Sequence, residues 1–124
     1  MGESASRTPR PWLVAKVSEI PPGQRKIVDI EGRSIGLFNV HGTFVAVLNV
    51  CPHQQAPVCR GRLSGTTLPS PPGEFLWGRD GEILACPWHG WEFDLLTGRP
   101  LADRRRRLRL YPVTIEDDTI FITL

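Results

Sequence analysis

Two short segments hold residue types that bind transition metals. Cys-Pro-His occupies positions 51–53 and Cys-Pro-Trp-His occupies positions 86–89, so each segment supplies one thiol and one imidazole. A proline in each loop lowers the entropy that is lost when the loop is ordered. Two such loops side by side provide two thiolates and two imidazoles, a set that suits zinc or an iron–sulfur centre. The candidate ligands are Cys51, His53, Cys86 and His89.

Each segment follows a short apolar stretch that indicates a β-strand. Thr43–Val50 precedes the first segment, and Ile83–Ala85 precedes the second. Loops carried on a rigid β scaffold are common places for binding residues. We therefore expect strand ends to position both loops.

The rest of the chain shows a period of two residues, which is typical of β-strands. This alternation covers residues 12–17, 27–30, 34–40 and much of 107–124, and clusters of Pro, Gly, Asp and Glu between them indicate turns. No convincing helical stretch is longer than two turns. The sequence predicts an all-β fold, a small antiparallel sandwich or barrel.

Length and composition limit the chain to one domain. It has 124 residues, of which 12 are glycine and 12 are proline, and this predicts many turns. Residues 68–75 predict a turn between two short strands, and residues 79–82 predict a tighter hairpin. Residues 1–11 are polar and lack periodicity, so we expect a disordered tail there and a single domain over residues 12–124.

The charge distribution argues against nucleic acid as a partner. The formal net charge is +2, but five arginines fall at positions 104–107 and 109, and without these five charges the remainder would carry −3. A nucleic-acid binder needs a broader basic face. The arginine run is either a solvated strand edge or a docking spot for an acidic redox partner, because complementary charge speeds encounter.

Cysteine use and hydropathy favour a cytoplasmic protein. Three cysteines are an odd number and too few for a secreted disulfide scaffold. The N-terminal residues contain no apolar signal segment, and the longest fully apolar run, Phe44–Leu48, is far too short to span a membrane. We expect no membrane association.

The paired motifs resemble those of the Rieske iron–sulfur family. The family signature is C-x-H followed downstream by C-x-x-H, and the resemblance extends over nearly the whole chain from about Trp12. It implies a small antiparallel β fold with two cluster-binding loops and a [2Fe–2S] cluster. In this family two cysteines bind one iron and two histidines bind the other. The resemblance thus assigns Cys51 and Cys86 to one iron, and His53 and His89 to the second.

Several positions depart from the family pattern. Gln55 stands where relatives usually have glycine, so the first loop should take a slightly different backbone. Cys59 has no cysteine partner in the second loop, and we expect a buried or loop thiol rather than a ligand. Trp91 and Phe93 replace a serine and a tyrosine whose hydroxyls raise the potential of high-potential relatives. This predicts a potential in the lower half of the roughly −150 to +300 mV Rieske range.

The resemblance implies a one-electron carrier that is not an enzyme on its own. Such a protein would shuttle electrons from a flavin reductase to a terminal oxidoreductase such as a ring-hydroxylating oxygenase. A small electron-transfer subunit resembling the nitrite-reductase type is an alternative within the family. After the two proposed ligands only His41 remains, so the chain cannot build the two-His-one-carboxylate iron site of a terminal oxygenase.

Two alternatives outside the family use the same residues. A structural zinc site would make the chain a binding module with no redox role, although zinc fingers usually pair Cys with Cys and His with His. A nucleophilic dyad of Cys86 and His89 is the second alternative, but it leaves the first loop unexplained.

Overall fold

The computed structural model describes five stretches of the chain, residues 10–52, 55–68, 76–88, 91–101 and 106–124. Short strands dominate these stretches, with two single-turn 3-10 helices and no α-helix among the residues described. The strands are β1 (Pro11–Lys16), β2 (Arg25–Ile30), β3 (Arg33–Val40), β4 (Thr43–Leu48), β5 (Arg62–Leu68), β6 (Leu76–Ala85), β7 (Glu92–Asp94), β8 (Leu110–Tyr111), β9 (Val113–Glu116) and β10 (Thr119–Thr123). The 3-10 helices are η2 (Val17–Glu19) and η3 (Val58–Arg60).

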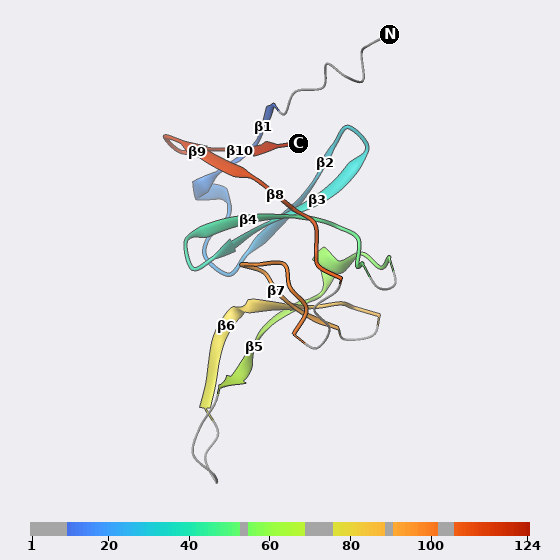
Figure 1. Cartoon of the computed structure of the whole chain (residues 1–124). Coiled ribbons are helices and arrows are strands. Elements are labelled where there is room, and N and C mark those ends of the chain that lie inside the picture. Colours follow the sequence, from blue (N-terminus) through green and yellow to red (C-terminus); the bar gives the residue numbers. More distant parts are fainter. Residues whose placement is uncertain (1–9, 53–54, 69–75, 89–90, 102–105) are drawn as a thin grey trace.

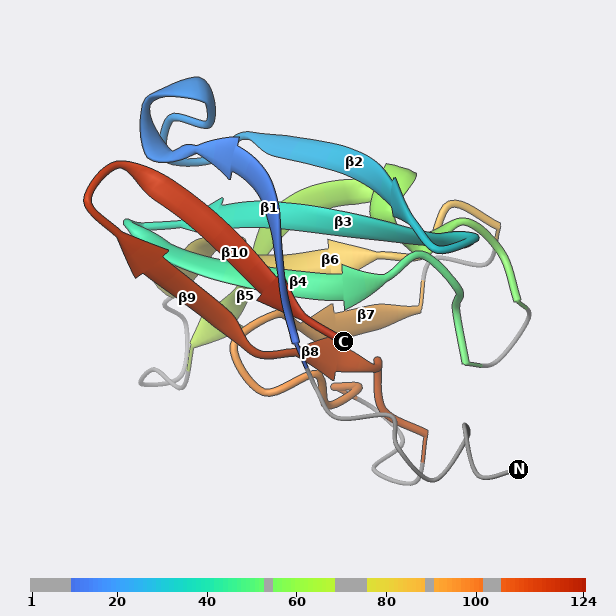
Figure 2. The same cartoon turned by 90° about the horizontal axis from the view of Figure 1, so that it is seen from above.

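The strands form three antiparallel sheets that lie in layers (Figure 1). One sheet has the strand order β1-β10-β9, the second has β2-β3-β4-β8 and the third has β5-β6-β7. Figure 2 shows β1, β9 and β10 crossing over the strands of the second sheet. The second sheet is therefore the central layer, and the all-β antiparallel fold expected from the sequence is confirmed.

Alternating side chains of β3 and β4 supply two separate cores. Leu37 and Ala46 belong to the core shared with the β1-β10-β9 sheet, where Ile120 and Ile122 are fully buried. Their neighbours belong to the other core, which contains residues of β6 and β7, and these neighbours are Phe38, Val40, Val45 and Val47. Because successive side chains of a strand point to opposite faces, a strand buried on both faces has a continuous apolar sequence.

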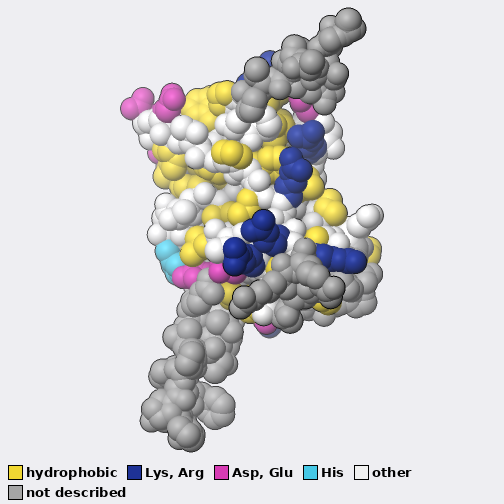
Figure 3. Space-filling model, viewed as in Figure 1, with side chains coloured by type: hydrophobic (Ala, Val, Ile, Leu, Met, Phe, Trp, Pro, Cys, Tyr) yellow, Lys and Arg dark blue, Asp and Glu magenta, His cyan; other side chains and the backbone are white. Residues whose placement is uncertain are grey.

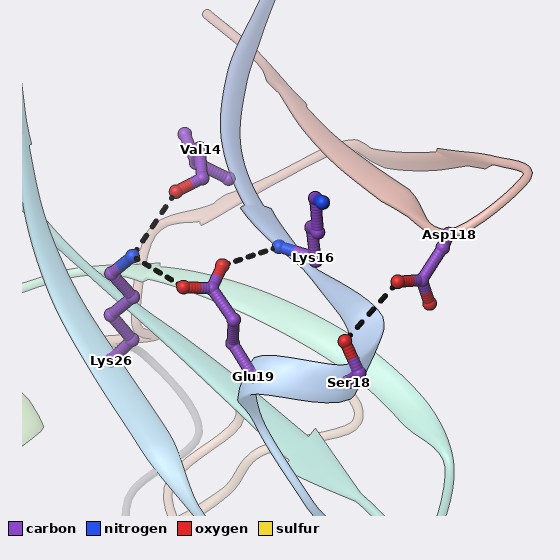
Figure 4. A network of polar contacts seen from close by, with 6 residues as sticks. All are labelled: Val14, Lys16, Ser18, Glu19, Lys26 and Asp118. Carbon is purple, nitrogen blue, oxygen red and sulfur yellow. Dashed lines mark hydrogen bonds and ion pairs between the residues drawn. The ribbon is translucent and has the colours of Figure 1, made fainter.

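Exposed polar contacts tie the first residues of the domain together (Figure 4). Glu19 accepts a hydrogen bond from the Lys16 backbone N–H at 2.7 Å and lies 3.9 Å from the Lys26 ammonium group. The Ser18 hydroxyl is 3.2 Å from a carboxylate oxygen of Asp118, in the turn between β9 and β10. Exposed contacts of this kind contribute little to stability. The two apolar cores therefore hold the layers together.

One predicted turn is wrong. Residues 79–82 do not form a hairpin but lie within the continuous strand β6. Ser64 pairs with Ile83 and Thr66 pairs with Gly78, so four residues of β6 stand opposite one residue of β5. Gly81 has a φ of +81°, a conformation that glycine adopts readily. These residues form a bulge rather than a turn because β6 pairs with β5 both before and after them.

The other predicted turn, at residues 68–75, falls between β5 and β6. Leu68 pairs with Leu76 across an antiparallel ladder. The rest of this predicted turn, residues 69–75, lies outside the described residues. Figure 1 shows β5 and β6 extending away from the central layer.

Pro11, which the sequence places in the tail, is the first residue of β1. It pairs with Thr123 in the first sheet, and the Arg10 guanidinium lies over the Trp12 ring at 4.5 Å. Residues 1–9 lie outside the described residues. Within the part of the chain that the structure describes, no helix has the length and hydropathy needed to cross a membrane.

Candidate metal centre

The two candidate thiols lie in one apolar cluster. Cys51 follows β4 and Cys86 follows β6, and these two loops leave the same end of the molecule (Figures 1 and 2). Cys51 is fully buried and Cys86 is 2% exposed. None of the three cysteines forms a disulfide. The cluster that surrounds Cys51 and Cys86 includes Ala56, Val58, Leu84, Phe93 and Leu95.

Backbone hydrogen bonds close the first loop around Cys51. The Cys51 N–H donates to the Ala56 carbonyl at 2.8 Å, and the Gln55 N–H donates to the Cys51 carbonyl at 2.7 Å. Gln55 has a φ of +60°, in the left-handed region that glycine favours. A side chain in this conformation costs roughly 1–2 kcal/mol. The loop accommodates glutamine through local strain, in a conformation that glycine adopts readily.

The second loop is closed in a similar way. The Cys86 N–H donates to the Trp91 carbonyl at 2.7 Å, and the partly buried Trp91 side chain packs against the apolar cluster. Trp88, between the two candidate ligands of this loop, is 59% exposed. A buried thiol beside an exposed aromatic residue places this loop at the surface, where a partner can approach.

A third segment folds back onto β7 next to the second loop. The Asp94 N–H donates to the Arg99 carbonyl at 2.8 Å, and the Leu101 N–H donates to the Glu92 carbonyl at 2.9 Å. Pro100 forms an isolated bridge with Phe93, which is fully buried in the cluster around the thiols. The segment therefore lies alongside the strand that follows the second loop.

The structure describes the two thiols but not the two imidazoles. His53 and His89 lie outside the described residues. Within the described ranges no group of three or more His, Cys, Asp or Glu side chains could hold a metal ion. His41 is in the turn between β3 and β4, where its Nε2 atom lies 3.5 Å from Glu82 Oε2. The full ligand set thus remains a prediction, with its two cysteines placed in one cluster.

Cys59 differs from the two candidate ligands in its environment. It lies in η3, is fully buried, and its thiol donates to the Val47 carbonyl at 3.4 Å. Burial raises the pKa of the Cys59 thiol from 9.0 to about 12, while the Gly36 backbone and the Arg25 charge act more weakly in the opposite direction. Cys59 is therefore a buried thiol that stays neutral at ordinary pH, which agrees with the buried or loop thiol expected from the sequence.

The donor set and its surroundings fit an iron–sulfur cluster. Soft thiolates select metals such as zinc and iron in clusters, and imidazole suits both. The apolar side chains around Cys51 and Cys86 exclude water, which limits hydrolysis and lowers the local dielectric. An all-β scaffold that holds two Cys-containing loops at one end has the layout of a small domain whose two loops could hold one metal centre.

Sequence comparison identifies the family. The profile of the Rieske [2Fe–2S] domain matches residues 10–112. The chain belongs to the Rieske [2Fe–2S] family, and its cofactor is a [2Fe–2S] cluster.

Individual relatives show the same class of protein. The chain is 36% identical over 115 residues to the ferredoxin component of a naphthalene 1,2-dioxygenase system from Pseudomonas aeruginosa, covering 91% of this chain and 95% of the relative. The structure of a reduced oxygenase with oxidised ferredoxin in carbazole 1,9a-dioxygenase matches with a TM-score of 0.71 and 23% identity, covering 90% of this chain and 91% of the other. A proposed small subunit of an NADH-dependent nitrite reductase from Mycobacterium tuberculosis matches with a TM-score of 0.71 and 21% identity, covering 95% and 97%. These two structural matches show the shared fold.

The raised pKa of Cys59 predicts how stability changes at alkaline pH. In the unfolded chain the thiol ionises near pH 9.0, whereas in the folded protein it stays neutral to about pH 12. The stabilisation is fully present below pH 9 and is lost as the pH rises towards 12, by up to about 1.4 kcal/mol per pH unit.

A Cys59→Ser variant keeps a donor for the Val47 carbonyl but has no group that titrates in this range. Denaturant unfolding between pH 8 and 11 should give a steeper loss of the free energy of unfolding in the wild type than in this variant. Equal pH slopes for the two proteins would contradict the assignment of a buried neutral thiol.

Proposed function

We propose that this protein is a Rieske ferredoxin that carries single electrons to a ring-hydroxylating oxygenase. The observation that carries the proposal is the match over nearly the full length to the ferredoxin component of a naphthalene 1,2-dioxygenase system, together with two buried thiols in one cluster at the loop ends. The chain itself is an electron carrier, and the oxygenase performs the catalysis. A nitrite-reductase role has only the shared fold in its favour.

The proposed ligands divide by type between the two irons. Cys51 and Cys86 bind one iron, and His53 and His89 bind the other. Support comes from the burial of both thiols in one cluster and from the position of each thiol at a strand end. The Cys59 side chain instead packs against Gly36 and its thiol donates to the Val47 carbonyl of the central sheet, so we do not assign it as a ligand.

When bound, the cluster takes up and releases one electron. The protein supplies the environment for this exchange. Val58, Leu84 and Leu95 are fully buried around the thiols and keep water away from the sulfur side. The backbone bonds of Cys51 and Cys86 fix the bases of their loops, which limits the movement of the two thiols during electron transfer.

The ligand assignment predicts different results for the three cysteines. Cys51→Ser and Cys86→Ser should each lose most of the bound iron and acid-labile sulfide, whereas Cys59→Ser should retain both. The measurement is iron, zinc and sulfide analysis of the purified proteins, with electron paramagnetic resonance of the reduced samples. A colourless wild-type protein that contains zinc and no sulfide would contradict the assignment and favour a structural zinc module.

The second loop also predicts a modest potential. Trp91 and Phe93 stand where high-potential relatives carry hydroxyl donors, and neither side chain can donate an O–H hydrogen bond to sulfur. Fewer donors stabilise the reduced cluster less. A redox titration should place the midpoint in the lower half of the roughly −150 to +300 mV range. A midpoint well above about +100 mV would contradict this explanation.

We infer that the electrons reach the protein from a flavin reductase and that the system works in the cytoplasm. The ferredoxin seen with its oxygenase in carbazole 1,9a-dioxygenase supports the delivery step for a protein of this class. A reductase is required because each electron that is delivered must be replaced. The naphthalene-system relative is likewise one component of a larger system.

Exposed arginines near the third segment offer a docking surface for an acidic partner. Arg106, Arg107 and Arg109 are exposed, and the Arg109 guanidinium lies over the Tyr111 ring at 5.4 Å. The Leu108 N–H donates to the Gly98 carbonyl at 2.8 Å, which places this stretch beside the segment that runs alongside β7. Figure 3 shows several separate groups of Lys and Arg side chains on the face seen in Figure 1. Residues 102–105, which carry the rest of the run, lie outside the described residues.

The docking proposal predicts a kinetic effect of charge reversal. Arg107→Glu and Arg109→Glu should each lower the rate of electron delivery to a purified oxygenase component several-fold at low salt and weaken its salt dependence. Lys16→Glu is the matched control, because it reverses an exposed charge in the β1-β10-β9 sheet, and it should have little effect. Stopped-flow kinetics at several salt concentrations measure both quantities. If the arginine variants behave like the control, the arginine run is only a solvated edge.

A further inference from the structure

The Asn49 side chain connects the start of the first cluster loop to its end. Asn49 precedes the loop, and its Oδ1 atom accepts a hydrogen bond from the Cys59 N–H at 2.8 Å. The Asn49 Nδ2 group lies 3.2 Å from the Ser34 hydroxyl, and the Asn49 N–H donates to the Ser34 carbonyl at 2.8 Å. Asn49 thus connects the start of the loop, the end of the loop and β3.

The Cys59 side chain fills the space between η3 and β3. A Cβ atom at Gly36 would lie 2.5 Å from Cys59 Sγ and 2.7 Å from its Cβ, so only glycine allows this approach. The Cys59 thiol also contacts the Val47 carbonyl of β4. The end of the first loop therefore packs directly against the central sheet.

Arg25 holds the same region from β2. Its Nη1 atom donates to the Cys59 carbonyl at 2.6 Å and to the Gly61 carbonyl at 2.5 Å. The guanidinium lies 5.2 Å from the centre of the Phe38 ring, and the residue is half-buried. Hydrogen bonds from a charged donor are about twice as strong as those between neutral groups. Arg25 thus stabilises both sides of the turn that ends η3.

This turn also touches the start of the second loop. An added Cβ atom at Gly61 would lie 1.7 Å from the Ala85 carbonyl oxygen, and Arg62 pairs with Ala85 in the β5–β6 ladder. Ala85 is followed directly by Cys86. Gly61, whose carbonyl accepts a hydrogen bond from Arg25, is therefore in close contact with Ala85 at the base of the second loop.

We propose that Arg25, Asn49 and Cys59 form a loop clamp that sets the position of the two cluster loops relative to each other. These are positioning residues, which act through Cys51 and Cys86. The clamp rests on the proposed function only for the identity of the group that the loops hold. When the clamp is weakened, both loops should open more often and the cluster should be lost faster.

The test combines two measurements on the purified holoprotein. The first is the rate at which a chelator bleaches the visible absorption. The second is hydrogen exchange, followed by mass spectrometry, in peptides that contain the Cys51 and Cys86 amides and in peptides from β1 and β10. The variants are Arg25→Met, Arg25→Lys, Asn49→Leu and Asn49→Asp. Arg10→Met is the matched control, because Arg10 also lies over an aromatic ring but makes its side-chain contacts with Trp12 and Glu31 rather than with the end of the first loop.

Arg25→Met should accelerate bleaching about tenfold or more, because it removes two charge-assisted hydrogen bonds. It should also accelerate exchange in both loops while leaving β1 and β10 unchanged. Arg25→Lys should fall between Arg25→Met and the wild type. Asn49→Asp keeps an acceptor for the Cys59 N–H and should remain near the wild type, whereas Asn49→Leu should resemble Arg25→Met. If Arg25→Met does not fold, the Arg25→Lys variant and the two Asn49 variants decide the question.

Two results would overturn the clamp. One is that the Arg25 and Asn49→Leu variants match Arg10→Met in bleaching and in loop exchange. The other is that exchange rises equally in β1 and β10, which would mean a loss of global stability. If the wild-type protein contains no iron or sulfide, the proposed function fails, and the exchange pattern still tests the clamp.

Discussion

Burial of the β3–β4 hairpin on both faces is the constraint on which the rest of the structure depends. One face packs against β1, β9 and β10, and the other face contributes to the core that contains both candidate thiols. Because this hairpin contributes side chains to both cores, the end of β4 cannot shift without disturbing both of them. The first loop begins directly after this tightly packed hairpin. The metal centre therefore takes its precision from packing that extends through the whole domain.

The two proposed thiolate ligands and the two proposed imidazole ligands have different roles. Cys51 and Cys86 are buried in apolar surroundings, whereas Trp88, next to the second proposed histidine, is largely exposed. In a Rieske centre two imidazoles replace two thiolates, which raises the potential relative to all-cysteine clusters. Among the described residues, the two thiols lie in the apolar core and Trp88 lies at the surface.

Much of the fold could be predicted from local pattern, and the failures have physical causes. The hairpin around Gly32 could be predicted because adjacent residues determine it. The structure of residues 79–82 depends on pairing with β5, so a local sequence pattern that indicates a turn forms a bulge instead. The motifs identified the candidate ligands because ligand spacing is local. The contacts of Arg25 with the end of η3 span more than thirty residues and depend on packing between layers, so no sequence pattern indicated them.

The most direct test of the central claim is pulsed electron paramagnetic resonance of the reduced protein labelled with nitrogen-15 in its histidines. The chain has three histidines, and His41 lies beside Glu82 in the turn that precedes β4, whereas Cys51 follows the other end of this strand. The account predicts strong magnetic couplings from two histidine nitrogens, which remain in a His41→Asn variant and disappear in stages when His53 and His89 are replaced. A reduced cluster that shows no histidine coupling would contradict it.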